Sequence, residues 1–176
     1  MQRKHLFVTA IAAAITTLLV LAGCGGQAPA PTSTSVESGG VSSSDGQRYR
    51  PVWVNPVLEG ESLSLQQSEV EQGKMVHFQI NLPSGKETFM AYKLDGVTHV
   101  RASICVPCRS TSFSLQKGVL VCDACGTKFE AKTGKGISGA CVNYPKDAAA
   151  FQTAGGKLVV AIADLEAAYA STREAG

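Results

Sequence analysis

Charge and aromatic side chains are both scarce in this sequence: charged residues make up 17% of its 176 residues and aromatic residues 6%. The 16 Lys and Arg residues nearly balance the 14 Asp and Glu residues, whereas phosphate binding needs clustered, unpaired cations. The composition therefore argues against nucleic acid as a partner. The sequence has no phosphate loop, no catalytic triad and no paired carboxylates in a supporting context, so we expect no enzyme, although an accessory role beside an oxidoreductase stays open.

Histidine is also scarce, with three residues in the whole chain. Arg109 and Gly126 follow two C-x-x-C pairs at the position where covalent haem attachment requires His, so a c-type haem is excluded. Strand alternation places His77 and His99 on polar faces. We expect both at the surface rather than in a copper or iron site.

The N-terminal region contains no acidic residue before Glu37. Basic residues at positions 3–5 precede a mostly apolar stretch over residues 6–22, which is the pattern of an export signal. The stretch ends in Leu-Ala-Gly-Cys and resembles the lipobox of bacterial lipoproteins, which implies a signal peptide over residues 1–23 and a lipidated Cys24. An uncleaved transmembrane helix is the alternative. We expect a membrane lipoprotein of the bacterial cell envelope, facing outside the cytoplasm.

Residues 24–47 are expected to form a flexible tether that begins at the lipidated cysteine. They are mostly Gly, Ser, Thr, Pro and Ala and show no apolar periodicity. Removal of the signal peptide would take away Arg3 and Lys4, leaving 14 basic and 14 acidic residues. The remainder, residues 48–176, is long enough for one hydrophobic core and is predicted to form one domain.

Apolar residues in this domain mostly alternate with polar ones, as they do in half-buried strands. Strands are predicted over residues 75–82 and 89–94, and Asp95-Gly96 predicts a tight turn into a third strand. Only residues 164–174 show a helical pattern, with Asp164 as the N-cap. We therefore predict a mostly β fold, a small antiparallel sheet or barrel, with one short C-terminal helix.

Five cysteines remain once Cys24 is assigned to lipid, and all lie within 37 residues: Cys105, Cys108, Cys122, Cys125 and Cys141. The first four form two C-x-x-C pairs separated by thirteen residues. Two such turns on a β-hairpin, here with Lys117-Gly118 at its tip, can direct four thiolates at one ion. The spacing predicts a metal site with four cysteine ligands.

Cys141 is not required by a four-coordinate site. It follows a loop with glycines at positions 134, 136 and 139, which can fold back over the hairpin. We expect Cys141 within reach of the other four thiols as a lid or exchange ligand, and a distant buried thiol is the alternative. Residues 101–135 also carry six basic side chains, which would lower the pKa of the thiols unless they are ordinary solvated residues.

These motifs, in this order, resemble the family of membrane iron–sulfur proteins called FtrD-like. The resemblance covers roughly residues 62–163 and rests on the five cysteines, the run Gly-Ala-Cys-Val-Asn-Tyr-Pro over residues 139–145 and a final strand after Gly156. Many members instead have two glycines and then Cys-Asn-Pro at this loop. The resemblance implies a metal or redox role for the four paired cysteines, with Cys141 as a further candidate ligand. It also implies a membrane iron-transport or redox protein as partner.

A second resemblance concerns the segment around the second cysteine pair. Residues 121–129, followed by a glycine loop and Tyr-Pro, look like the second cluster-binding loop of Rieske domains with cysteine in place of histidine. The resemblance implies a Rieske-like cysteine hairpin within the β fold, and a zinc-ribbon-like hairpin is the alternative. All-thiolate ligation would bring the reduction potential toward that of ferredoxins.

Three occupants fit these cysteines, and the sequence leaves them open. An iron–sulfur cluster, serving electron transfer or metal handling, agrees with the family resemblance. A zinc ion can bind after export and would make the protein a zinc-stapled binding module without redox activity. Two disulfides would make it a thiol redox protein, since exported thiols without metal tend to oxidise.

Overall fold

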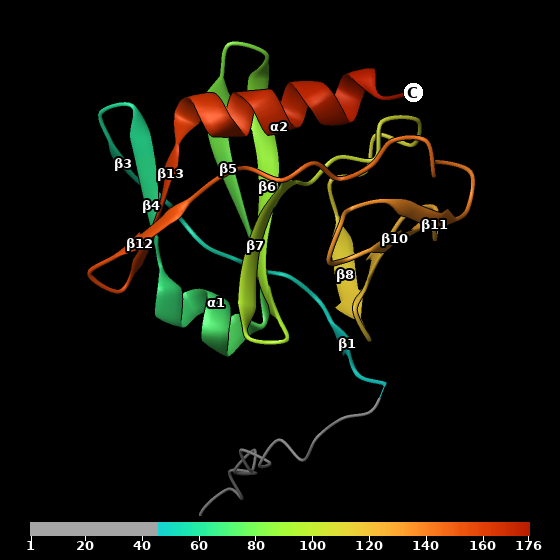
Figure 1. Cartoon of the computed structure of the whole chain (residues 1–176). Coiled ribbons are helices and arrows are strands. Elements are labelled where there is room, and N and C mark those ends of the chain that lie inside the picture. Colours follow the sequence, from blue (N-terminus) through green and yellow to red (C-terminus); the bar gives the residue numbers. More distant parts are fainter. Residues whose placement is uncertain (1–45) are drawn as a thin grey trace, which may run out of the picture. The chain divides into compact units, whose positions relative to one another are not determined.

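The structure is a computed structural model that describes residues 46–176 (Figure 1). The expected signal peptide over residues 1–23, the lipidated Cys24 and nearly all of the tether lie outside these residues. The described chain forms thirteen strands, arranged in three sheets, and two helices. The expectation of a mostly β fold with a short C-terminal helix is confirmed.

The central sheet has the strand order β2-β5-β6-β7 and contains the three predicted antiparallel strands. Asp95 and Gly96 have φ values of 49° and 80°, which the two central residues of a type I′ hairpin require. The second strand begins before the expected residue 89, because the turn is confined to Pro83 and Ser84. The strands are β2 (Val52–Trp53), β5 (Met75–Leu82), β6 (Gly85–Leu94) and β7 (Val97–Ala102).

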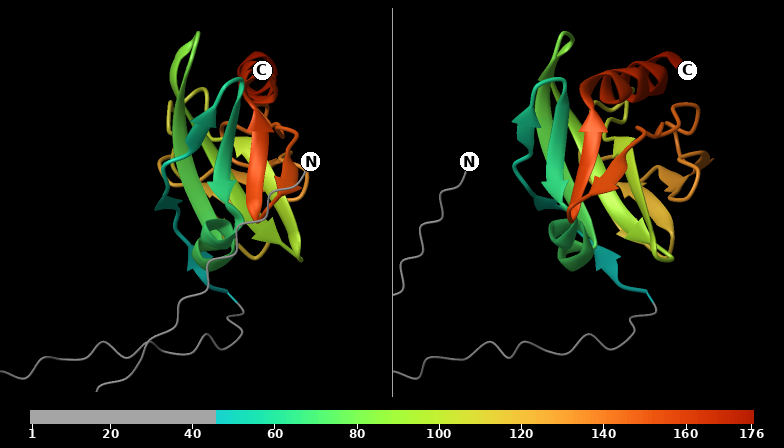
Figure 2. Two further views of the ribbon diagram at one scale, coloured as in Figure 1. Left: turned by 90° about the vertical axis from the view of Figure 1, so that its left-hand side faces the viewer. Right: turned by 60° about the vertical axis from the view of Figure 1, so that its left-hand side comes forward.

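A second sheet packs against the central one and has the order β12-β13-β4-β3. One hydrophobic core joins β4 and β13 to the apolar face of the central sheet and to both helices. Figure 2 shows these two sheets with α2 at one end of them. The strands are β3 (Val57–Glu59), β4 (Ser62–Gln66), β12 (Gln152–Ala154) and β13 (Lys157–Ala161).

The two helices correct the sequence-based expectation in two ways. Helix α2 (Ile162–Glu174) begins after Ala161, so Asp164 lies in its first turn and is not the N-cap. The prediction of a single helix is wrong, because α1 (Gln67–Gly73) follows β4. This helix is too short to show a helical period, and a capping box between Gln66 and Glu69 begins it. No helix within residues 46–176 is long and apolar enough to cross a membrane.

The third sheet, in the order β1-β8-β9-β10-β11, carries the cysteines. Lys117 and Gly118 have φ values of 48° and 73° at the tip of the β8–β9 hairpin, as predicted. A second core lies beneath this sheet and includes three of the cysteines, Phe113, Phe129 and residues of the central sheet. The strands are β1 (Arg48–Tyr49), β8 (Phe113–Gln116), β9 (Val119–Cys122), β10 (Lys128–Glu130) and β11 (Gly136–Ser138).

The second core covers the face of the central sheet that the alternation predicts to be polar. Met90 and Tyr92, which share that face with His77, are fully buried within this core. The surface position expected for His77 is therefore wrong, because its side chain is 0% exposed. His99 is half-buried and stacks on Tyr92 at 5.3 Å between ring centroids.

Candidate metal centre

The five cysteines come from three separate loops that meet at one end of the third sheet. Cys105 and Cys108 lie in the turn after β7, and the amide of Cys105 donates to the Ser110 carbonyl at 2.7 Å. Cys122 ends β9, and Cys125 lies in the turn before β10. Cys141 lies in the loop that follows β11. The fold thus assembles thiols that are up to 36 positions apart in the sequence.

The sulfur atoms lie close together without forming a disulfide. The Sγ atoms of Cys105, Cys108, Cys125 and Cys141 all lie within 4.8 Å of one another. Cys122 is the fifth thiol, with its Sγ 3.7 Å from that of Cys108. All five cysteines singled out from the sequence are therefore gathered in one place. Which of them bind metal stays a prediction.

The turn that carries the second pair is closed by backbone hydrogen bonds. The amide of Cys122 donates to the Thr127 carbonyl, and the amide of Gly126 donates to the Cys122 carbonyl, both at 2.9 Å. Gly126 has a φ of 71°, the left-handed conformation that glycine adopts without strain. These contacts place Cys122 inward and leave Cys125 exposed.

The loop that carries Cys141 packs tightly against the second turn. The amide of Cys141 donates to Thr127 Oγ1 at 3.3 Å, and the Sγ atoms of Cys141 and Cys125 are 3.9 Å apart. Gly139 has a φ of 112°, and a Cβ at this position would lie 2.6 Å from Thr127 Oγ1. The loop therefore approaches the site only because residue 139 has no side chain.

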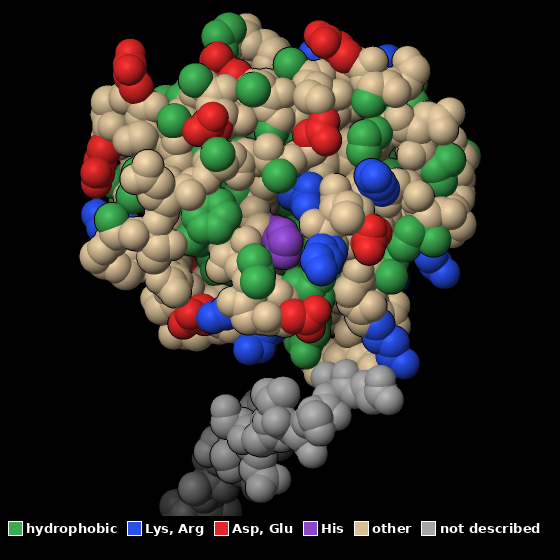
Figure 3. Space-filling model, in the orientation of Figure 1, with side chains coloured by type: hydrophobic (Ala, Val, Ile, Leu, Met, Phe, Trp, Pro, Cys, Tyr) green, Lys and Arg blue, Asp and Glu red, His purple; other side chains and the backbone are tan. Residues whose placement is uncertain are grey.

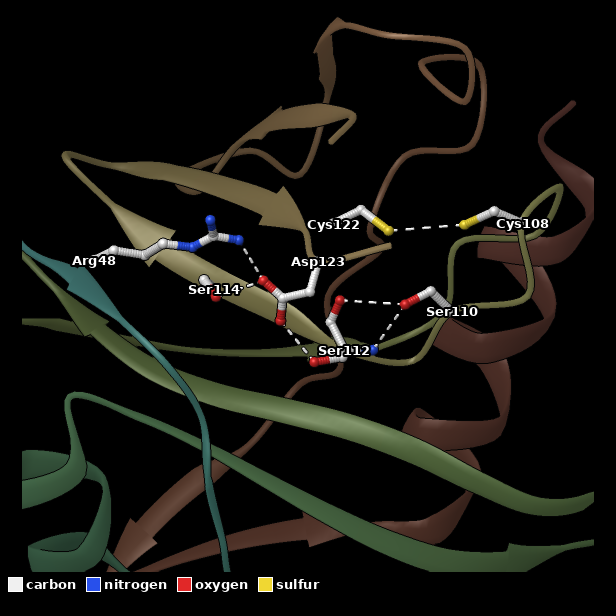
Figure 4. A network of polar contacts seen from close by, with 7 residues as sticks. All are labelled: Arg48, Cys108, Ser110, Ser112, Ser114, Cys122 and Asp123. Atoms are coloured by element: carbon white, nitrogen blue, oxygen red, sulfur yellow. Dashed lines mark hydrogen bonds and ion pairs between the residues drawn. The ribbon is translucent and has the colours of Figure 1, made fainter. Parts of the chain in front are cut away.

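Asp123, between the two cysteines of the second pair, anchors this turn to its neighbours (Figure 4). Its carboxylate accepts hydrogen bonds of 2.6 Å from the hydroxyls of Ser112 and Ser114 and forms an ion pair with Arg48. Burial alone would raise the pKa of Asp123, but these hydrogen bonds and Arg48 lower the pKa below its usual range. The carboxylate is therefore ionised at neutral pH and holds strand β1 beside the site.

The pKa values of three thiols of the site are shifted, and the shifts differ in direction. Burial raises the pKa of both Cys105 and Cys108. Burial also acts to raise the pKa of Cys125, but hydrogen bonds with the side chain and backbone of Thr127 lower it to about 6. Cys125 is thus more ready than Cys105 or Cys108 to bind a metal ion as thiolate.

Lys146 is a functional candidate that the sequence analysis missed. Its side chain is 0% exposed, and Nζ donates to the carbonyls of Ile104 at 2.6 Å and Tyr144 at 2.7 Å. The ammonium group lies over the Phe129 ring, 4.5 Å from its centroid. No residue pattern marks this lysine, because its partner Ile104 is 42 positions away.

Of the six basic residues expected around the site, one is buried and five are exposed. Arg101 is buried and donates to the Tyr92 hydroxyl and to the carbonyls of Lys132 and Lys146. Arg109, Lys128, Lys132 and Lys135 are exposed, and Lys117 is at the hairpin tip. The buried cation beside the cysteines is Lys146.

The donor set fits an iron–sulfur cluster or a zinc ion, both of which bind through thiolates. Five reduced thiols lie within sulfur–sulfur contact of a neighbour, and four of them can surround one centre. The buried ammonium group beside them has no carboxylate partner within residues 46–176, which suits a site of negative charge.

Comparison with known families bears on the site. The profile of the family described as "Membrane iron-sulfur containing protein FtrD-like" matches residues 70–171, which include all five clustered cysteines. A comparison with curated proteins gives no match.

Among solved structures, a chain from a complex of reduced oxygenase and oxidized ferredoxin of carbazole 1,9a-dioxygenase is 18% identical, with a TM-score of 0.48. The match covers 59% of this chain and 95% of that one. The ferredoxin of carbazole 1,9a-dioxygenase from Nocardioides aromaticivorans IC177 is 15% identical, with a TM-score of 0.44, over 61% of this chain and 98% of the other.

Proposed function

Because this chain belongs to the FtrD-like family of membrane iron–sulfur proteins, we propose that its clustered cysteines hold an iron–sulfur centre that transfers single electrons. The observation that carries the proposal is the convergence of five reduced thiols within residues matched by the family profile. A bound cluster would supply a one-electron couple whose potential depends on its thiolate ligands and their hydrogen bonds.

The protein itself positions the ligands and limits access of water to them. Cys105, Cys122 and Cys141 are buried, whereas Cys108 and Cys125 are exposed. The exposed pair marks the edge of the site that an electron-transfer partner can approach. Phe113 and Phe129 pack beneath the buried thiols and form part of the same core.

We place Cys105, Cys108 and Cys125 as constant ligands, because they belong both to the two sequence pairs and to the group of four close sulfur atoms. The fourth ligand is shared between Cys122 and Cys141. Cys122 completes the second sequence pair and lies against Cys108, whereas Cys141 completes the group of four. A five-thiol site of this kind can exchange one ligand without losing its metal.

The proposed location is the outer face of a bacterial membrane, where Cys24 carries the lipid. The family is described as membrane-associated, and the lipid on Cys24 and the tether would hold the domain near the bilayer. A membrane transport or redox protein is the proposed partner. Metal handling for such a transporter agrees with the same site.

The test is the absorption spectrum, between 300 and 600 nm, of full-length protein purified without air, together with its iron and sulfide content. Sulfide-to-iron charge transfer colours a cluster, and we expect bands that bleach on reduction. A colourless protein that contains zinc would contradict the proposal and support a zinc-stapled module. Cys24→Ala serves as the control, because it removes a cysteine that is not in the cluster.

A further inference from the structure

Lys146 is unusual among the lysines of the structure because it is fully buried and carries no carboxylate partner. Within residues 46–176, the ion pairs join other cations to Asp123, Glu71 and Glu59. Its ammonium group has two carbonyl acceptors and the faces of two aromatic rings. Dipoles and rings do not cancel a full charge, so a buried cation in this position needs an anion nearby.

Among residues 46–176, the negative charges that act on Lys146 are those of the cysteine site. Burial lowers the pKa of Lys146 to about 8, whereas the charges of Cys105, Cys108, Cys122 and Cys141 act to raise it. Four thiolates around a divalent ion carry a net negative charge. The carbonyl acceptors also belong to the site, because Ile104 precedes Cys105 and Tyr144 lies in the loop that follows Cys141.

We propose that Lys146 is the counter-cation of the cysteine centre: its charge stabilises the thiolate-bound cofactor, and its two hydrogen bonds fasten the Cys105 loop to the Cys141 loop. This inference rests on the proposed thiolate-bound centre. A fixed positive charge favours the more negative, reduced state of a redox centre, so Lys146 raises the reduction potential. It acts on the cofactor through charge and position, without being a ligand.

The experiment compares Lys146→Gln with the wild type and with Lys146→Arg in full-length protein purified without air. Glutamine keeps a hydrogen-bond donor but loses the charge, whereas arginine keeps the charge. The first measurement is the chelator concentration that removes half of the bound metal, and the second is the reduction potential. Lys135→Gln is the matched control, since Lys135 is an exposed lysine of the same sheet region.

We expect Lys146→Gln to lose half of its metal at about one-tenth of the chelator concentration that the wild type requires, within the range seen for residues that support ligands. We also expect a tenfold shift in the ratio of reduced to oxidised protein, which is about 59 mV toward lower potential for a one-electron couple. Lys146→Arg should keep most of the metal retention and of the reduction potential of the wild type. Equal metal retention and equal potential in Lys146→Gln and the wild type would overturn the role of Lys146 and leave the thiolate centre standing.

The wild-type protein supplies an independent measurement in case the variants do not fold. Lys146 is the one buried lysine of the described chain, so its ammonium protons should exchange slowly and give a distinct NMR signal after labelling of lysine with ¹⁵N. That signal should move when the chelator removes the metal. An unmoved signal would overturn the inference, and a wild-type protein that holds no metal at all would overturn both this inference and the proposed function.

Discussion

At the scale of single residues, the fourth ligand position is where sequence and geometry disagree. The sequence pairs Cys122 with Cys125, but the closest group of four sulfur atoms contains Cys141 instead. Both thiols are buried, and each lies less than 4 Å from the sulfur of an exposed cysteine. The site therefore holds one more ligand than a tetrahedral ion or a simple cluster needs.

We predict that Cys122→Ser and Cys141→Ser each keep a bound metal, because the remaining thiol of the two can take the vacant position. Each substitution should change the absorption bands, and the double variant should lose metal affinity by about 100-fold or more. Metal content and absorption of the purified variants check this. Removal of all metal by a single substitution at either residue would contradict a shared ligand position. Cys105→Ser, which removes a constant ligand, is the control for complete loss of metal.

His77 is a residue whose burial should appear in the pH dependence of stability. Both ring nitrogens are buried and have no hydrogen-bond partner among the described residues, and the ring meets that of Trp53 edge-on. Burial lowers the pKa of His77 from 6.5 to about 4, although Asp123 acts to raise it. The unfolded chain therefore binds a proton at higher pH than the folded one does.

We predict that the contribution of His77 to stability is complete above pH 6.5 and is lost as the pH falls toward 4, by about 3 kcal/mol. His77→Phe, which fills the site with an apolar ring, should remove this part of the acid destabilisation. Denaturant unfolding of both proteins between pH 7 and 4 measures the difference. An identical pH profile would show that His77 is not buried as neutral imidazole, and His99→Phe, at a half-buried position, is the control.

At the scale of elements, the loop after β11 depends on a close approach of backbone to side chain. Gly139 lies against Thr127, whose hydroxyl oxygen accepts hydrogen bonds from the amide of Cys141 and the thiol of Cys125. This one contact therefore sets the positions of two thiols. A side chain at residue 139 must displace either Thr127 or the whole loop.

We predict that Gly139→Ala destabilises the protein by about 1–3 kcal/mol and weakens metal retention, because the added Cβ overlaps Thr127. Gly155→Ala is the matched control: residue 155 also has a positive φ, 56°, but a Cβ there meets nothing within 4 Å. Gly155→Ala should lower the free energy of unfolding by about 1 kcal/mol and leave the metal content unchanged. Unfolding and metal content of the two variants separate backbone strain from close approach, and equal metal content in both would contradict the prediction.

At the scale of the whole molecule, the face drawn in Figure 3 carries charges of both signs. Figure 3 shows acidic and basic side chains interspersed over one face, without a large area of one sign. This agrees with the balance of charges in the sequence. Such a face offers no basic stripe for nucleic acid, and its long-range field for steering a charged partner is weak.

We predict that Cys24→Ala releases the protein from the membrane fraction and leaves its absorption spectrum unchanged, because stable anchoring depends on the acyl chains and the metal centre depends on other cysteines. Fractionation of cells that express each form, followed by spectra of the purified proteins, checks both parts. A mutant that remains in the membrane pellet would favour an uncleaved N-terminal helix.

The sequence by itself determined the features that depend on near neighbours. The C-x-x-C turns, the hairpins at Asp95-Gly96 and Lys117-Gly118, and the strand over residues 75–82 follow from backbone preferences and from alternation over a few residues. The gathering of the five cysteines was also foreseeable, because a hairpin brings two pairs together and a glycine-containing loop can return to it.

Only the tertiary structure decided which surfaces are covered and which charges meet. His77 is buried because the cysteine-bearing sheet covers the second face of the central sheet, and strand alternation cannot show whether that face is free. Lys146 lies against Ile104, and Arg101 reaches the carbonyls of Lys132 and Lys146, across separations of 31 to 45 residues. Contacts at such separations follow from how the sheets pack. No local preference of the chain encodes them.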